Sequence, residues 1–165
     1  MADCPVVGVV GRSGVGKTYF LERLIPALHD LACDVAVVKH THHCGLETDR
    51  SGTDSYRLWA AGAENVVLAS PDRTVCSYRH SEEPGLSWVL TRIEGVDLVL
   101  LEGCKRSGVP KLELVRAARS IRPLGGLVNR LAFVTDVAAV CQQGRCFELD
   151  DYEAVARFLV QRLDN

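Results

Sequence analysis

The sequence predicts an α/β fold in which helices flank a mainly parallel β-sheet. Short apolar runs rich in β-branched residues, typical of buried parallel strands, alternate with segments of helical spacing. A glycine-rich loop joins the first apolar run to the first helical segment. The chain has 165 residues, of which 47% are hydrophobic and 24% charged, a balance that suits a globular core. We therefore expect a single domain spanning residues 1–165.

The glycine-rich loop matches a known motif. Residues 11–18 read Gly-Arg-Ser-Gly-Val-Gly-Lys-Thr and fit Gly-x-x-x-x-Gly-Lys-[Ser/Thr], the phosphate-binding P-loop. An apolar run over 5–10 precedes it and apolar residues at helical spacing follow it, which is the context of strand, loop and helix that the motif requires. The alternative is a glycine-rich turn that contains Lys-Thr by chance. We expect a P-loop NTPase-like fold whose phosphate site comprises Gly11, Ser13, Gly14, Val15, Gly16, Lys17 and Thr18.

Two side chains of the P-loop and one later acid have expected chemical roles. Lys17 would place a positive charge against the β- and γ-phosphate oxygens, and the Thr18 hydroxyl would ligate Mg²⁺. Glu102 closes the apolar run 96–101, where a P-loop protein usually presents an acid to the metal or its waters. Asp97 competes for this role but lies at the opposite end of that strand, roughly 16 Å away. We expect Lys17 and Glu102 as catalytic residues and Glu102 at the metal, with a solvated strand-end glutamate as the alternative.

Turn and cap residues divide the rest of the chain into elements. Pro26 lacks the N–H that a helix interior needs, so we expect the first helix to kink or restart there. Residues 34–38 read as a second buried strand, and Thr53 or Asp54 would cap a helix that Gly62 ends. The same patterns predict a hairpin of strands 65–69 and 74–78, helices over 86–93 and 150–163, and strands over 96–101, 111–116 and 131–134.

Residues just past each strand are the next candidates, because ligands of parallel sheets bind at the carboxyl ends of the strands. Lys39 follows the strand 34–38 and would contact the nucleotide. Asp136 follows the strand 131–134, and its carboxylate can accept from both the N1–H and the 2-amino group of guanine, whereas adenine offers a lone pair at N1. Asp136 would thus select GTP over ATP, or it would cap a helix starting at Val137. The full Asn-Lys-x-Asp signature of common GTPases is absent.

Two polar groups after the second strand admit more than one interpretation. Residues 40–44 contain three histidines and a cysteine, which suit zinc, but their spacing fits no closed site, and a polar loop over the phosphates is the alternative. Asp49 or Asp54 would order the water shell of Mg²⁺, and Arg57 would contact phosphate or a partner. For these three residues the alternative is a helix cap or a surface ion pair.

A basic run follows Glu102. Between positions 105 and 130 lie seven basic residues and one acid. Such a run is usually a solvated face, and the alternative is a seat for an anionic cofactor or a partner surface. The seven are Lys105, Arg106, Lys111, Arg116, Arg119, Arg122 and Arg130.

The composition excludes several classes of protein. A net charge of −2 and a pI near 6.2 argue against nucleic-acid binding, and no apolar run approaches the roughly 20 residues of a membrane span. Residues 1–4 include no basic region, so we expect no signal peptide and a cytoplasmic protein. The seven cysteines form no Cys-x-x-Cys, so we expect reduced thiols, with Cys33 and Cys76 acting as small hydrophobic residues.

The motifs follow one another in a characteristic order. They are Gly11–Thr18, Val37–His40, His43, Asp49, Gly52–Arg57, Ala61–Ala63, Leu98–Lys105, Lys111–Glu113 and Val134–Asp136. Many families share the P-loop, whereas the series Lys-His…Gly-x-Asp-Ser-x-Arg…Glu-Gly-x-Lys is far more specific. From Val6 to Asp136 the chain resembles the MobB family, the molybdopterin-guanine dinucleotide biosynthesis adaptor proteins.

The resemblance implies a protein that binds GTP with Mg²⁺ and hydrolyses it weakly. It implies a homodimer that assists the guanylyltransferase MobA, which attaches GMP to molybdopterin. Strands from the hairpin 65–78 and the segment 111–116 would join the subunits, and the basic run would face MobA, molybdopterin or its guanine dinucleotide. Weak hydrolysis agrees with the residues, since no glutamine or arginine finger, a contribution of about 10³- to 10⁵-fold, is evident. The alternatives are a small-molecule P-loop kinase and a GTP-driven metallochaperone.

Overall fold

The computed structural model describes residues 4–41, 44–46 and 49–163, which fall into two compact units. Residues 1–41 and 91–165 contribute to the first unit, and residues 42–90 contribute to the second. The single domain expected over 1–165 stays a prediction. Among the described residues, no helix combines the length and the apolar character that crossing a membrane requires.

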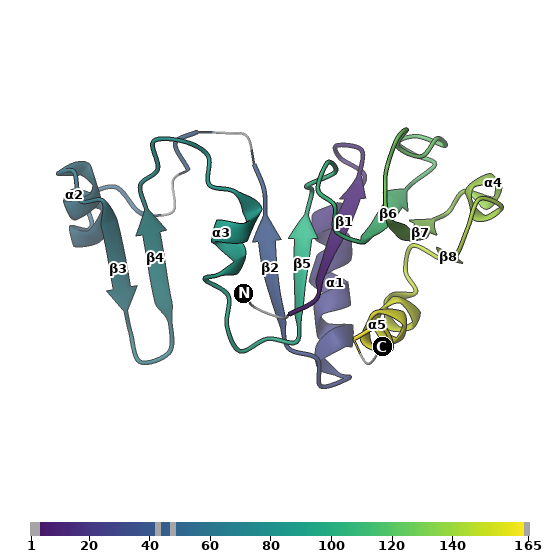
Figure 1. The fold of residues 1–165 in the computed structure, drawn as a ribbon, viewed down its shortest axis with the longest axis horizontal. Coiled ribbons are helices and arrows are strands. Elements are labelled where there is room, and N and C mark those ends of the chain that lie inside the picture. Colours follow the sequence, from purple (N-terminus) through teal and green to yellow (C-terminus); the bar gives the residue numbers. More distant parts are fainter. Residues whose placement is uncertain (1–3, 42–43, 47–48, 164–165) are drawn as a thin grey trace. The chain divides into compact units, whose positions relative to one another are not determined.

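Six strands within the described residues form one sheet in the first unit, in the order β2-β5-β1-β6-β7-β8 (Figure 1). Every neighbouring pair is parallel, which confirms the predicted α/β class. The carboxyl ends of the strands therefore lie along one edge, the usual ligand edge of such a sheet. The strands are β1 (Val6–Gly11), β2 (Val35–Lys39), β5 (Leu98–Glu102), β6 (Lys111–Val115), β7 (Arg130–Thr135) and β8 (Cys146–Phe147).

Both faces of the sheet are covered at β6, which is therefore buried along its whole length. Leu114 packs into the main core with α1 (Lys17–His29) and α5 (Tyr152–Val160). Val115, the next residue, belongs to a smaller cluster that includes α4 (Ala138–Cys141), because successive side chains of a strand point to opposite faces. Each leucine buried in the main core contributes about 1.5–3 kcal/mol, so these contacts hold the β1–α1 junction in place.

The position of β6 contradicts one predicted interface. The segment 111–116 is predicted to join two subunits, but β6 pairs with β1 on one side and with β7 on the other. A strand that is hydrogen-bonded on both sides within its own sheet has no free edge for a second chain. This half of the predicted subunit interface is wrong.

Helix α1 continues through Pro26, so the predicted restart is wrong. The N–H of Asp30 donates to the carbonyl of Pro26 at 2.9 Å, which continues the helical pattern beyond the proline. Pro26 itself is exposed, while Leu24 and Leu28 on either side of it are fully buried. Burial of these leucines offsets the cost of the proline, about 3 kcal/mol in a helix interior, and keeps the helix whole.

The second unit consists of short helices and the predicted hairpin. Thr53 caps its first helix by accepting from the N–H of Tyr56 at 3.3 Å, which confirms one of the two predicted caps. The N–H of Ser70 donates to the carbonyl of Arg73 at 2.8 Å and closes the turn between the antiparallel strands. The elements are α2 (Asp54–Ala60), β3 (Asn65–Ala69), β4 (Thr74–Tyr78) and α3 (Leu86–Leu90).

Several elements differ in extent from the predictions. Helix α3 ends at Leu90 rather than at residue 93, and α5 covers 152–160 rather than 150–163. A helix starting near Val137 is one of the two alternatives predicted for Asp136, and α4 is that helix, while the two-residue strand β8 is not predicted, because so short a segment shows no periodic pattern. All seven cysteines are free thiols, and Cys33 is buried as predicted, whereas Cys76 is exposed.

Candidate functional site

The predicted P-loop lies between β1 and α1, at the carboxyl edge of the sheet. Gly11 ends β1 with φ +155°, and a Cβ at this position would lie 2.6 Å from the carbonyl oxygen of Leu114 in β6. Only glycine fits there, because the loop leaves the sheet against the neighbouring backbone. Gly16 is the N-cap of α1 and supplies no capping side chain. The first N–H groups of α1 therefore remain directed at the loop, where an anion would accept from them.

Lys17 lies at the centre of a small electropositive group. Its Nζ donates to the carbonyl of Arg12, at 3.3 Å. Burial lowers the pKa of the Lys17 ammonium below its usual value, and the carboxylate of Glu102 opposes this shift. The positive charges of Lys105 and Lys39 lower the pKa of Lys17 further. A phosphate group arriving at the loop would relieve this repulsion between like charges.

Glu102 connects the P-loop with β2. Its Oε1 accepts from the hydroxyl of Thr18 at 2.9 Å, and its Oε2 lies 3.5 Å from Nζ of Lys39. The side chain of Glu102 is only 12% exposed, so the carboxylate is held at the edge rather than solvated. A hydroxyl beside a carboxylate is a set of hard oxygen donors that fits Mg²⁺. Asp97 lies before β5 and accepts from the N–H of Asp34 at 2.8 Å, at the opposite end of the strand.

Asp136 follows β7 on the same edge. Its Oδ1 accepts from the N–H of Ala117 at 2.7 Å. The N-cap of α4 is Val137, without a side-chain cap, so the prediction of Asp136 as a helix cap is wrong. Since β7 is the second strand from β1 in the sheet, Asp136 lies roughly 10 Å to the side of the P-loop. A nucleotide lying along the edge would have its phosphates at β1 and its base at β7.

Asp49 and Asp54 belong to the second unit and make local contacts there. Asp49 accepts from the N–H of Arg50 at 2.7 Å and from the hydroxyls of Thr53 and Ser55. These bonds, the one from Ser55 first, lower the pKa of Asp49. The side chain of Asp54 is 95% exposed and lies 3.5 Å from Arg57, as the ion-pair alternative predicts. A metal role for Asp54 stays a prediction.

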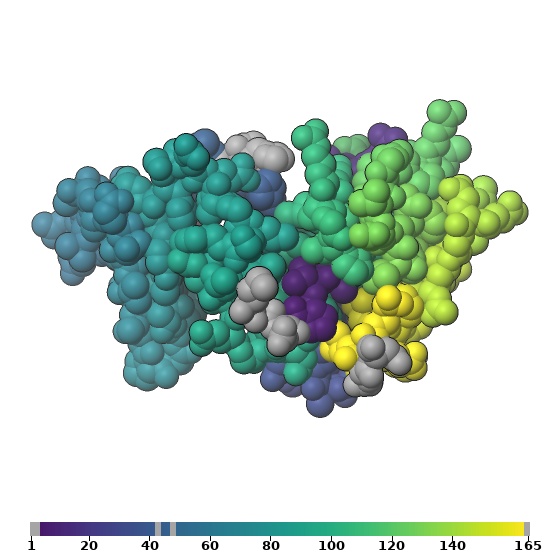
Figure 2. All heavy atoms as spheres, in the orientation of Figure 1, coloured from purple at the N-terminus to yellow at the C-terminus, as the bar shows by residue number. Residues whose placement is uncertain are grey.

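The basic run is divided between buried and exposed residues, so its description as one solvated face is wrong. Lys111 is fully buried, and its Nζ donates to the carbonyls of Ser107 and Val109 at 2.6 and 2.7 Å. Burial lowers the pKa of this ammonium. Nε of Arg130 donates to the buried carboxylate of Glu113 at 2.7 Å. The exposed members are Lys105, Arg106, Arg116, Arg119 and Arg122. The green segment that carries them reaches the surface in Figure 2.

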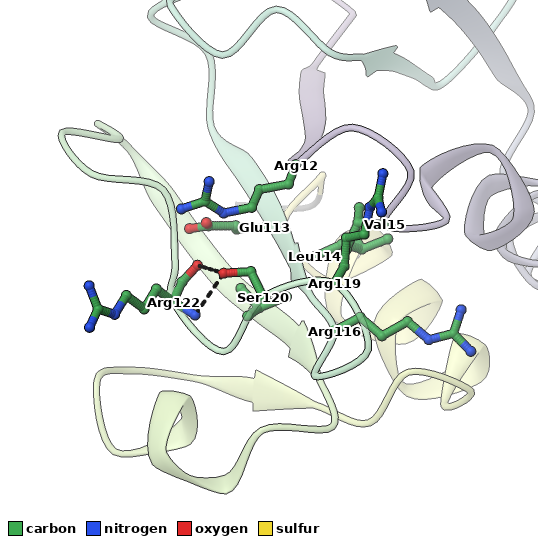
Figure 3. A pocket seen from close by; sticks show the side chains of 9 residues that line it. Arg12, Val15, Glu113, Leu114, Arg116, Arg119, Ser120 and Arg122 are labelled. Atoms are coloured by element: carbon green, nitrogen blue, oxygen red, sulfur yellow. Dashed lines mark hydrogen bonds between the residues drawn. The ribbon is translucent and has the colours of Figure 1, made fainter.

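Two arginines of the exposed group lie against the P-loop, which the sequence did not predict. Nε of Arg119 donates to the carbonyl of Ser13 at 3.0 Å, and Arg116 approaches Gly16. Arg119 lies beside Val15 in a shallow pocket, whereas Arg122 extends away from the loop (Figure 3). Lys105 belongs to the basic run, and its effect on the pKa of Lys17 appears only in the structure. No local pattern around Arg119 points to the P-loop.

Both interpretations of residues 40–44, a polar loop over the phosphates and a zinc site, fall partly outside the described residues, since His42 and His43 are not among them. The N–H of His40 donates to the carbonyl of Glu102 at 3.3 Å, which fixes the end of β2 to β5. Within 4–41, 44–46 and 49–163 no three histidine, cysteine or acidic side chains are grouped to hold a metal ion.

Known proteins resemble this chain in sequence and in fold. The family described as MobB, molybdopterin guanine dinucleotide synthesis protein B, matches residues 6–136. The molybdopterin-guanine dinucleotide biosynthesis adapter protein of Haemophilus influenzae is 38% identical over 114 residues, which are 68% of this chain and 64% of that protein. Its Escherichia coli counterpart is 32% identical over 163 residues, 95% of this chain and 92% of that protein. A crystal structure of a molybdopterin-guanine biosynthesis protein B shares 29% identity and a TM-score of 0.76, covering 97% of this chain and 99% of the other.

Proposed function

Because the chain belongs to the MobB family, molybdopterin guanine dinucleotide synthesis protein B, we propose that it is an adaptor in molybdopterin guanine dinucleotide biosynthesis that binds GTP and Mg²⁺. One observation carries the proposal. The P-loop presents Lys17 and the bonded pair Thr18 and Glu102 at the same sheet edge as Asp136. In one bound nucleotide, Lys17 would contact the phosphates, Thr18 and Glu102 would hold the metal, and Asp136 would contact the base.

Each group has one task in this arrangement. The main-chain N–H groups of Gly14, Gly16 and the first turn of α1 donate to the β- and γ-phosphate oxygens. Lys17 neutralises these oxygens, while Thr18 and Glu102 hold Mg²⁺ directly or through its waters. Lys39, 3.5 Å from Glu102, is close enough to the metal site to contact the phosphates. Asp136 accepts from guanine.

Hydrolysis by this site would be slow. Nε of Arg119 donates to the Ser13 carbonyl, which ties this arginine to the P-loop backbone, whereas an arginine finger reaches the transferred phosphoryl group. Metal and lysine bind the phosphates but do not by themselves orient the attacking water. GTP would thus remain bound long enough to act as a switch ligand or to be passed to a partner enzyme.

The relatives carry the word adapter in their names, which implies a partner enzyme. We infer that this partner is the guanylyltransferase MobA, with molybdopterin or its guanine dinucleotide as the shared ligand. Purified MobA would be retained by the immobilised chain in the presence of GTP and Mg²⁺. Equal retention by a column that carries an unrelated P-loop protein would contradict the adaptor role.

The nucleotide assignment is tested by calorimetric titration of the wild-type chain. GTP is expected to bind at least about tenfold more tightly than ATP, because adenine places a lone pair against Asp136. Removal of Mg²⁺ with EDTA is expected to weaken GTP binding by about tenfold or more, since the phosphate charge is then balanced by lysines alone. A preference for ATP, together with phosphorylation of a small-molecule acceptor, would instead support a kinase.

The homodimer is proposed to form through the β3–β4 hairpin. Leu68 and Val75 are cross-strand partners on one face, and they are 47% and 37% exposed. Val67 on the opposite face is 57% exposed. Exposed apolar side chains on a two-stranded sheet are a surface that a second copy of the chain would cover.

Leu68→Asp is expected to shift the chain from dimer to monomer in sedimentation velocity experiments at micromolar concentration. A carboxylate in the covered apolar face would weaken association by roughly 100-fold, since it loses the leucine contact and buries a charge. The matched control is Ile121→Asp, an exposed apolar position of the first unit that is 64% exposed. A wild-type chain that sediments as a monomer would contradict the proposal.

A further inference from the structure

One turn joins the P-loop to Asp136. Residues 116–120 follow β6, and the N–H groups of Arg119 and Ser120 donate to the carbonyl of Arg116 at 2.8 and 2.9 Å. At one side of this turn the N–H of Ala117 donates to Asp136, at 2.7 Å. At the other side the Arg119 side chain donates to the P-loop. The turn is therefore held by two bonds, whose acceptors Ser13 and Asp136 are distant from each other in the sequence.

The guanidinium of Arg119 lies directly on the backbone of the P-loop. Besides the 3.0 Å bond from its Nε to the Ser13 carbonyl, its Nη2 lies 2.9 Å from where a Cβ of Gly14 would be. Gly14 also has φ +71°, a conformation that other residues rarely adopt. Glycine at position 14 thus meets two demands at once, the left-handed backbone and the guanidinium packed against it.

Among the described residues, Arg119 has a carbonyl rather than a carboxylate as its side-chain partner. In the part of the chain that the structure describes, no carboxylate lies within ion-pair distance of this guanidinium. A guanidinium has five N–H donors, and only the Nε–H is engaged by Ser13. An arginine with a neutral carbonyl as its partner, in contact with an anion-binding loop, adds positive potential where phosphates would enter.

We propose that Arg119 is a positioning residue that holds the P-loop in its anion-accepting conformation, and that Asp136 holds the turn that carries Arg119. Through this turn the carboxylate expected to bind the base stabilises the loop expected to bind the phosphates. The part of the proposal that concerns nucleotide affinity rests on the proposed function. The part that concerns loop order does not, because the bonds of Arg119 to Ser13 and of Ala117 to Asp136 join protein groups only.

The test compares Arg119→Ala with Arg122→Ala, which removes the same charge from the same loop at a residue that extends away from Val15. Amide hydrogen exchange of residues 12–16 is measured first, without nucleotide. Loss of a hydrogen bond from a charged donor is expected to speed this exchange by about tenfold or more in Arg119→Ala and to leave it unchanged in Arg122→Ala. Arg119→Lys retains a donor but not the flat contact with Gly14, so an intermediate rate is expected.

Affinities for GTP and GDP are measured next on the same variants. A positioning role predicts that Arg119→Ala weakens both nucleotides equally, by about tenfold, because the whole loop is loosened. Loss of GTP affinity without loss of GDP affinity would overturn the proposal and make Arg119 a γ-phosphate contact. Unchanged exchange of residues 12–16 in Arg119→Ala would also overturn it. If the wild-type chain binds no GTP, the proposed function is refuted. The amide hydrogen exchange of residues 12–16 still decides whether Arg119 positions the loop.

Discussion

Lys17→Ala is expected to weaken GTP binding by at least about 100-fold and to leave the fold intact. Two charge-assisted hydrogen bonds to phosphate oxygens, each contributing about 1.5–3 kcal/mol, would be lost. The fold should survive because, among the residues that the structure describes, the Lys17 ammonium donates only to the Arg12 carbonyl, at 3.3 Å. Burial also lowers the pKa of Lys17, so the folded chain holds this charge less readily than the unfolded chain does. Titration calorimetry with GTP and circular dichroism on one preparation measure both results.

Lys105→Ala is the control for this variant. It removes one positive charge that acts on Lys17 through space, and it leaves every residue of the P-loop motif in place. A loss of affinity of only a few-fold is expected, since the charge of Lys105 reaches the phosphates across solvent. If Lys17→Ala binds GTP as tightly as the wild-type chain does, the phosphate site is not at residues 11–18.

Asp136→Asn is expected to change the preferred base from guanine to xanthine. The carboxylate accepts from two donors of guanine, whereas asparagine offers one acceptor and one donor, which match the N1–H and 2-oxo groups of xanthine. GTP affinity should fall by about 100-fold, and XTP should become the better ligand. The asparagine oxygen can still accept from the N–H of Ala117, so the turn over 116–120 should remain in place. Competition binding of GTP against XTP, on the wild-type chain and on Asp136→Asn, measures the change in base preference directly.

Asp150→Asn, at an exposed carboxylate before α5, controls for the change in net charge. No change in base preference is expected from it. Should Asp136→Asn leave the ratio of GTP to XTP affinity as it is in the wild-type chain, Asp136 would not contact the base. That outcome would remove guanine selection from the proposed function while leaving the P-loop assignment untouched.

The P-loop and its neighbours could be predicted because their chemistry is local. The strand, the glycines and the helix are consecutive in the chain, so one motif specifies both the conformation and the position of Lys17 and Thr18. Glu102 could be added because it ends an apolar strand, and such strands in an α/β protein share one ligand edge. Hydrophobic pattern and turn residues likewise predict the hairpin of β3 and β4.

Contacts between distant residues were decided by the tertiary structure alone. Arg119 and Ser13 are 106 positions apart, and β6 brings them together only because it is inserted beside β1 in the sheet. The same placement buries Lys111 and denies β6 a free edge, although its sequence reads as part of an exposed basic run. Periodicity and motifs report the conformation of neighbouring residues, whereas strand order depends on which apolar faces pack best across the whole chain. The sequence by itself therefore determined the glycine-rich loop over residues 11–18 between β1 and α1, and the packing of the sheet determined which side chains surround it.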